Sequence, residues 1–144
     1  MTESPEGPGS APVLLLELLE SSGPLPPRFQ YRTRIRVLRR GEAVLVDWEH
    51  QDAQGSREGA YALPTPRLQA LKAVLLQALP PGTCLDRTAG FRDRKGISFN
   101  SLTTAWDGPP SRLDYLLSDL EEPGGDPIVR AAVLAIKGLM GGPG

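Results

Sequence analysis

The chain has few of the residues from which metal and redox sites are built. Its 144 residues contain one cysteine, Cys84, and one histidine, His50. This excludes an intramolecular disulfide and any zinc or iron–sulfur site that needs several cysteines. Motifs of the Gly-x-Gly-x-x-Gly, Walker and His-Glu-x-x-His types are also missing. We therefore expect no metal and no other cofactor.

The chain also lacks a long apolar run and an excess of charge of one sign. The apolar stretch from Val13 to Leu19 is much shorter than a membrane span and contains Glu17. The 16 Lys and Arg residues are balanced by 17 Asp and Glu residues, whereas nucleic-acid-binding proteins concentrate uncompensated basic residues. These features predict a cytoplasmic protein that binds neither membranes nor nucleic acid.

Proline and glycine are common, and they mark the boundaries of the predicted domain. Residues 1–12 are a mixture of Pro, Gly, Ser and Glu that buries too little apolar surface to offset the cost of ordering. We predict a disordered N-terminal tail at 1–12, a single α+β domain at 13–140 and a flexible C-terminal tail at 141–144.

Residues 28–50 have the clearest pattern, that of a β-hairpin. Apolar residues alternate with polar ones from Phe29 to Val37 and again from Val44 to Trp48, with Gly41 between the two runs. Two registers keep both apolar sets on one face. With Arg40-Gly41 as the loop, Arg34 faces Asp47 and Arg32 faces Glu49. With Gly41-Glu42 as the loop, Arg36 faces Asp47 and Arg34 faces Glu49.

In either register two of the three arginines of this strand lie opposite carboxylates. The row formed by Arg32, Arg34 and Arg36 could by itself be interpreted as a phosphate-binding strip. Opposed by Asp47 and Glu49, it is better interpreted as a solvated, salt-bridged face.

The remaining patterns complete an α+β order of elements. Residues 13–20 suit a buried strand slightly better than a short helix. Strands are predicted near 58–63, 83–87 and 97–106, and helices at 65–79 with Thr65 as the N-cap, from Ser111 onward, and from Asp126-Pro127 onward. We predict a mainly antiparallel sheet of about five strands covered by about three helices.

Three groups of residues are candidates for function. The glycine-bounded loop with Arg92, Asp93 and Arg94, together with Trp106 at a strand end, is the candidate partner-binding surface. Tyr31, Trp48 and His50 share the apolar face of the hairpin and are the candidates for a small-molecule pocket, although the periodicity favours a packed core at these residues. No residue is assigned a catalytic role, and Cys84 is expected to be a small buried hydrophobe.

Two family resemblances can be stated at the level of element order. If residues 13–20 are helical, the order is similar to that of small acidic dimeric secretion chaperones. The hairpin followed by PTPRLQALKAVLLQAL is similar to the second half of emfourin-type protease inhibitors, whose glycine-rich N-terminal signature is not present. Neither resemblance carries a motif that transfers residues, and fold analogy does not establish function.

The sequence favours a non-enzymatic protein that acts on another protein. Such a protein could be an inhibitor, an immunity-like factor, a secretion-chaperone-like protein or a regulatory subunit, and a homodimer is possible. The alternative is a small-molecule-binding domain or minor enzyme with a pocket beside the aromatic face of the hairpin.

Overall fold

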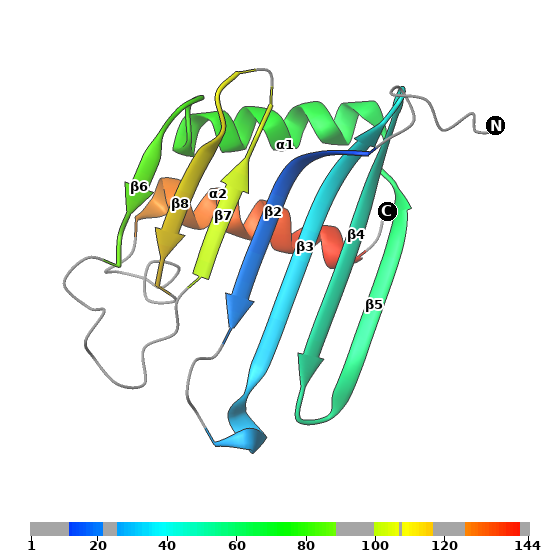
Figure 1. Ribbon diagram of the computed structural model, residues 1–144, viewed down its shortest axis with the longest axis vertical. Helices are drawn as coiled ribbons and strands as arrows, with labels where there is room; N and C mark the ends of the chain where they lie inside the picture. Colours follow the sequence, from blue (N-terminus) through cyan, green and yellow to red (C-terminus); the bar gives the residue numbers. More distant parts are fainter. Residues whose placement is uncertain (1–11, 22–25, 89–99, 107, 117–125, 142–144) are drawn as a thin grey trace.

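A computed structural model describes residues 12–21, 26–88, 100–106, 108–116 and 126–141. In this part of the chain, one seven-stranded sheet carries two α-helices on the same face (Figure 1). The predicted α+β class is confirmed, while the counts of about five strands and about three helices differ from those observed.

The sheet is antiparallel except at one edge. The strands are β2 (Val13–Ser21), β3 (Tyr31–Arg40), β4 (Ala43–Asp52), β5 (Gly55–Ala62), β6 (Cys84–Asp86), β7 (Asn100–Thr104) and β8 (Ser111–Tyr115). Their order across the sheet is β5-β4-β3-β2-β7-β8-β6, and only β6 pairs in parallel, with β8. The helices are α1 (Thr65–Ala78) and α2 (Pro127–Lys137), with short 3-10 turns η2 (Pro27–Phe29) and η4 (Gly138–Gly141).

The hairpin adopts the second of the two predicted registers. Arg40 pairs with Ala43, so Gly41 and Glu42 form the loop, and Gly41 has a φ of 61°. A positive φ at the first loop position suits the primed turns that follow the twist of a two-residue hairpin. Arg36 consequently lies opposite Asp47 and Arg34 opposite Glu49.

Residues 13–20 form a strand rather than a helix. In β2, Leu16, Leu18 and Glu20 are buried, while Leu19 is exposed. Burial at every second residue is typical of a strand with one covered face. The two edges of β2 pair with β3 and β7. Because this segment is not helical, the element order that resembles secretion chaperones is not formed.

The prediction of a helix that begins at Ser111 is wrong for the described residues. Residues 111–115 form β8, with Ser111, Leu113 and Tyr115 buried and Arg112 exposed. The pattern Ser-Arg-Leu-Asp-Tyr has the period of a strand, and pairing with both β7 and β6 outweighs the apparent capping box. Residues 117–125 lie outside the described part of the chain.

The two helices begin in different ways. The N-cap of α1 is Pro64 and makes no side-chain capping hydrogen bond, so Thr65 is the first helical residue rather than the cap. In α2 the predicted cap is confirmed, because the Asp126 carboxylate accepts hydrogen bonds from the backbone N–H groups of Ile128 and Val129.

The core lies between the helices and the sheet face that they cover. It joins buried residues of five strands to those of both helices; at its centre Ile35, Leu75 and Val133 are fully buried. Trp48 lies on this face over Gly59, where an added Cβ would come within 2.5 Å of the indole nitrogen. Glycine is therefore the residue that lets the indole approach β5 this closely.

Candidate functional site

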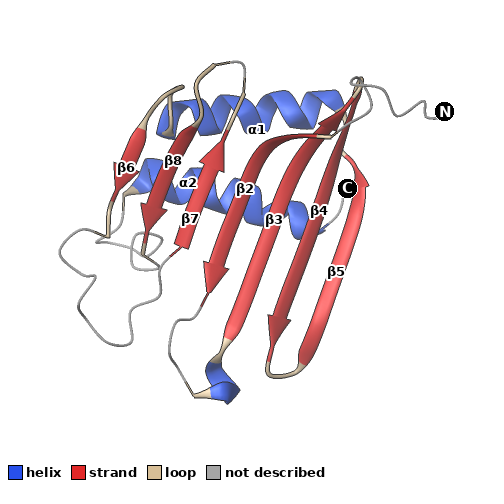
Figure 2. Ribbon diagram, in the orientation of Figure 1, coloured by secondary structure: helices blue, strands red, loops and turns tan. Residues whose placement is uncertain are grey.

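The face of the sheet opposite the helices is uncovered by any described element (Figures 1 and 2). Alternation along the strands places the arginines of β3 and the facing carboxylates of β4 on this open face, together with Leu19, Leu38 and Leu45. A broad sheet surface of mixed polarity is thus left facing solvent.

The arginine row of β3 runs along the centre of the open face. Arg36 forms an ion pair with Asp47 at 2.6 Å, as the register predicts. Arg34 lies opposite Glu49, yet no carboxylate of the described residues forms an ion pair with Arg32 or Arg34. The predicted neutralisation of this row is therefore only partly achieved.

Two arginine nitrogens of this row have no acceptor within the described part of the chain. The Nε–H groups of Arg34 and Arg36 are buried, and no described residue accepts a hydrogen bond from either.

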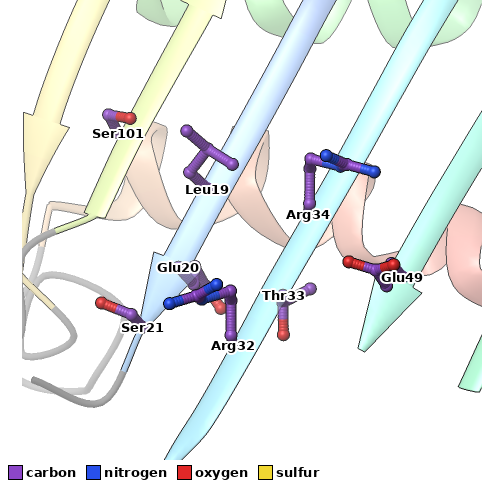
Figure 3. Close-up of a pocket in the computed structure, with 8 residues that line it drawn as sticks. All are labelled: Leu19, Glu20, Ser21, Arg32, Thr33, Arg34, Glu49 and Ser101. Carbon is purple, nitrogen blue, oxygen red and sulfur yellow. The ribbon is translucent and has the colours of Figure 1, made fainter. Parts of the chain in front are cut away.

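A hollow of about 450 Å³ lies beside this row. Six of the side chains that line it share the open face: Leu19, Ser21, Arg32, Arg34, Glu49 and Ser101. In Figure 3 Arg32 extends from β3 across β2 toward Ser21, whereas Arg34 extends to the other side, toward β4. The two guanidinium groups therefore mark two separate cationic points rather than one clamp.

On the covered face, a buried carboxylate ties the sheet to α2. Glu20 is 2% exposed, accepts a hydrogen bond from the Tyr115 hydroxyl at 2.6 Å and pairs with Lys137 at 2.9 Å. Burial, together with the neighbouring Glu20 carboxylate, raises the pKa of Tyr115 far above its ordinary value, so the phenol remains a donor. The arrangement satisfies all three groups and is structural.

The single histidine lies in a short polar chain on the same face. His50 Nδ1 is 2.8 Å from the Thr33 hydroxyl, and His50 Nε2 is 3.3 Å from Asp52. The backbone N–H of Gln54, and then His50 and Arg57, lower the pKa of Asp52 despite some opposing desolvation. A hydroxyl, an imidazole and a carboxylate in sequence resemble a nucleophilic triad, but Thr33 is only 2% exposed and is inaccessible to a substrate.

The predicted aromatic pocket is brought together in part. Tyr31 and His50 stack with ring centroids 6.5 Å apart and an interplanar angle of 22°. Burial, and then Glu20, raise the pKa of Tyr31. Trp48 lies two residues along the same strand and packs against the core, which favours the packed-core interpretation for Trp48 and leaves the other two as a half-buried pair.

The predicted partner-binding residues are only partly visible. Arg92, Asp93 and Arg94 lie outside the described residues. Trp106 is half-buried, packs against the core and has Lys72 over its ring at 5.8 Å; its indole N–H has no acceptor among the described residues. Cys84 is exposed rather than buried, because it lies on β6, the short edge strand of the sheet.

Sequence reasoning missed the importance of Leu19, Glu20 and Ser101. The alternation of β2 contains the signal for Glu20, since a strand that buries Leu16 and Leu18 also turns residue 20 inward. No local signal pairs Glu20 with Lys137, which is far away in sequence.

Neither a metal centre nor a membrane span is found in the part of the chain that the structure describes. Its His, Cys, Asp and Glu side chains form no group of three or more that could hold a metal ion. None of its helices has the length and apolarity needed to cross a membrane. In comparisons with known proteins, no family model, no curated protein and no solved structure matches the chain.

Proposed function

We propose that this chain is a non-enzymatic protein-interaction or regulatory protein that binds another protein through the open face of its sheet. The observation that carries the proposal is the centre of that face, where Leu19 is 39% exposed beside Arg32 and Arg34, which pair with no described carboxylate. Exposed apolar surface beside arginine is a typical composition of a protein interface.

The polar groups of the covered face are buried or already hydrogen-bonded, which is consistent with this proposal. Among the described residues, the hydroxyl hydrogen-bonded to His50 belongs to Thr33, which is buried, and nucleophilic catalysis needs an accessible nucleophile. Glu20 is engaged by Tyr115 and Lys137. These polar groups stabilise the fold. We therefore expect the partner to bind the open face instead.

The test is affinity capture from the native source with three forms of the protein. Leu19→Gln removes apolar contact area from the open face, and Leu134→Gln does the same on α2, where Leu134 is 52% exposed. Neither change alters net charge. We expect the same partner to be captured by the wild type and by Leu134→Gln but lost from Leu19→Gln, with all three showing equal thermal unfolding.

Two outcomes overturn the proposal. One is capture of the partner by Leu19→Gln but not by Leu134→Gln, which would place the interface on the helices. The other is the absence of any protein that distinguishes the three forms.

A second candidate function is small-molecule binding beside Tyr31 and His50. The stacked ring pair and the imidazole held between Thr33 and Asp52 support it. Because His50 is the only histidine, the Hε1 proton of its ring gives a single NMR signal of its type. A ligand that binds there shifts this signal, and the shift disappears in Tyr31→Leu; a signal that no aromatic or amine-containing metabolite moves excludes this candidate.

A further inference from the structure

The two edges of the sheet differ in how much backbone they leave for another strand. At one edge, β6 has only three residues. At the other edge, β5 runs for eight residues, pairs with β4 in an unbroken register and contains no proline (Figures 1 and 2). Short strands, prolines and bulges are common features that prevent an edge from pairing with another chain. Because β5 has none of the three, it is the edge that can accept a strand.

The hydrogen-bond pattern identifies which backbone groups of β5 point outward. The N–H of Leu63 donates to the carbonyl of Val44 at 2.8 Å and continues the ladder between β5 and β4. In an antiparallel ladder every second residue directs both its N–H and its C=O to the same neighbour. The odd-numbered residues of β5 therefore bond to β4. The even-numbered residues direct these groups outward, where no described strand lies: Ser56, Glu58, Ala60 and Ala62.

The order of charges along β5 selects a second copy of the same strand in one register. Two antiparallel copies are related by a symmetry axis normal to the sheet, so one residue of the strand lies opposite itself. With Arg57 or Glu58 at the axis, two like charges face each other, which is unfavourable. With Gly59 at the axis, Glu58 faces Ala60 and Ser56 faces Ala62. An axis nearer either end of β5 pairs fewer residues.

The side chains on the covered face fit the same register. With Gly59 at the axis, Arg57 lies opposite Tyr61 of the second copy in a pair of the closely spaced, non-hydrogen-bonded type. The Arg57 side chain is 71% exposed, and its contact with Asp52 is a long one of 3.9 Å. The Tyr61 ring is held in place because its hydroxyl donates to the Leu139 carbonyl. A guanidinium group over a fixed aromatic ring is a favourable contact.

We propose that this chain forms a homodimer in which the β5 strands of two copies pair antiparallel, with Gly59 at the symmetry axis. Each outward-facing residue of β5 then belongs to a pair that exchanges two backbone hydrogen bonds. The two sheets become one, with the helices of both copies on one side and both open faces on the other. This inference goes beyond the proposed function, since it concerns the edge of the sheet and not its open face.

The test is sedimentation velocity over a dilution series, with charges introduced at two exposed positions of β5. Ala60 faces Glu58 of the second copy twice in each dimer. Ala60→Lys should therefore tighten dimerisation about fivefold, and Ala60→Glu should weaken it about fivefold. Adding Glu58→Lys to Ala60→Glu restores opposite charges and should restore the dimer.

Matched controls carry the same charges one pair further along the strand. Ala62 faces the uncharged Ser56 of the second copy, so Ala62→Lys and Ala62→Glu should each change the dimer dissociation constant by less than about twofold. All four single variants alter side chains on the open face of an edge strand, where the structure leaves Ala60 and Ala62 exposed. Their circular dichroism spectra should match that of the wild type at low concentration.

Three outcomes overturn the inference. The first is that the wild type and Ala60→Lys are both monomeric up to about 1 mM, which corresponds to very weak association. The second is a dimer that responds to the variants at Ala62 as strongly as to those at Ala60. The third is a monomer whose Ala60→Glu variant loses a different captured protein, which would make the edge a site for a foreign strand.

The proposed function fails separately from this inference. Leu19 lies on β2, away from the edge formed by β5, so Leu19→Gln should dimerise as the wild type does. If Leu19→Gln dimerises normally and no captured protein distinguishes it from the wild type, the β5 dimer is supported and only the proposed partner on the open face is overturned.

Discussion

The two faces of one sheet satisfy their polar groups in opposite ways. On the covered face Glu20, Thr33 and Asn100 are buried, and each is hydrogen-bonded within the chain. On the open face Arg36 is paired, while the Nε–H groups of Arg34 and Arg36 have no described acceptor. These three buried polar side chains of the covered face are engaged within the chain, whereas the arginine row of the open face is engaged only in part.

This difference shows where the chain can bind without losing its fold. A buried donor that loses its acceptor costs stability, so the covered face has little freedom to exchange partners. On the open face Arg34 forms no ion pair with a described carboxylate, so a partner that contacts it displaces none of the described ion pairs. Binding and folding can thus use opposite sides of the same strands, because neighbouring side chains of β3 point in opposite directions.

The strongest test of this difference between the two faces is to truncate, one at a time, two adjacent residues of β3 that lie on opposite faces. Ile35 is 0% exposed in the core and Arg34 is its neighbour on the open face. Ile35→Ala removes buried methyl groups and should lower the free energy of unfolding by about 2–5 kcal/mol. Arg34→Ala should change it by less than about 0.5 kcal/mol. Urea unfolding followed by tryptophan fluorescence measures both.

Some results of this experiment would contradict the expected difference between the two faces. If Arg34→Ala destabilises the protein as much as Ile35→Ala does, the guanidinium is part of the fold rather than a free binding group. A marked stabilisation by Arg34→Ala instead would show that its unsatisfied Nε–H costs more than its packing contributes.

Much of the fold could be predicted because strand alternation is a local property. The period of two in residues 29–37 and 44–48 places Ile35 and Val46 on the covered face, as the structure has them. The helix predicted at Ser111 failed for a non-local reason. Leu113 and Leu116 have helical spacing, yet β7 and β6 supply pairing partners that no local pattern contains.

The candidate site was harder to predict than the fold. The register gives Arg34 opposite Glu49, but whether two side chains form an ion pair depends on rotamers that the register leaves open. Leu19 looked like part of an apolar run, and only its neighbours across the sheet show that it faces solvent. The strands on either side of it come from residues 31–40 and 100–104, which no local reading brings together.

A second, smaller effect concerns the buried carboxylate that joins the covered face to α2. Glu20→Ala leaves the Tyr115 hydroxyl buried without its acceptor and Lys137 without its partner. We expect a loss of about 1–3 kcal/mol in unfolding free energy. Glu20→Gln keeps an acceptor for Tyr115 and should lose less, because the Lys137 side chain is 32% exposed. Calorimetric melting distinguishes the two, and equal losses would mean that the charge on Glu20 matters more than its hydrogen bond.

The smallest expected effect lies at the end of the covered face, where β3, β4 and β5 extend past α2 in Figure 1. The pKa of Asp52 is lowered by the backbone N–H of Gln54, and then by His50 and Arg57. A carboxyl group with a lower pKa in the folded state stabilises the protein above its unfolded pKa of about 4 and loses this contribution as the pH falls through the folded value. Wild type should therefore be more stable than Asp52→Asn at pH 7, and the difference should shrink below about pH 4. Urea midpoints measured from pH 7 to about pH 3 test this; a difference that stays constant over this range would show that Asp52 contributes through its shape and not through its charge.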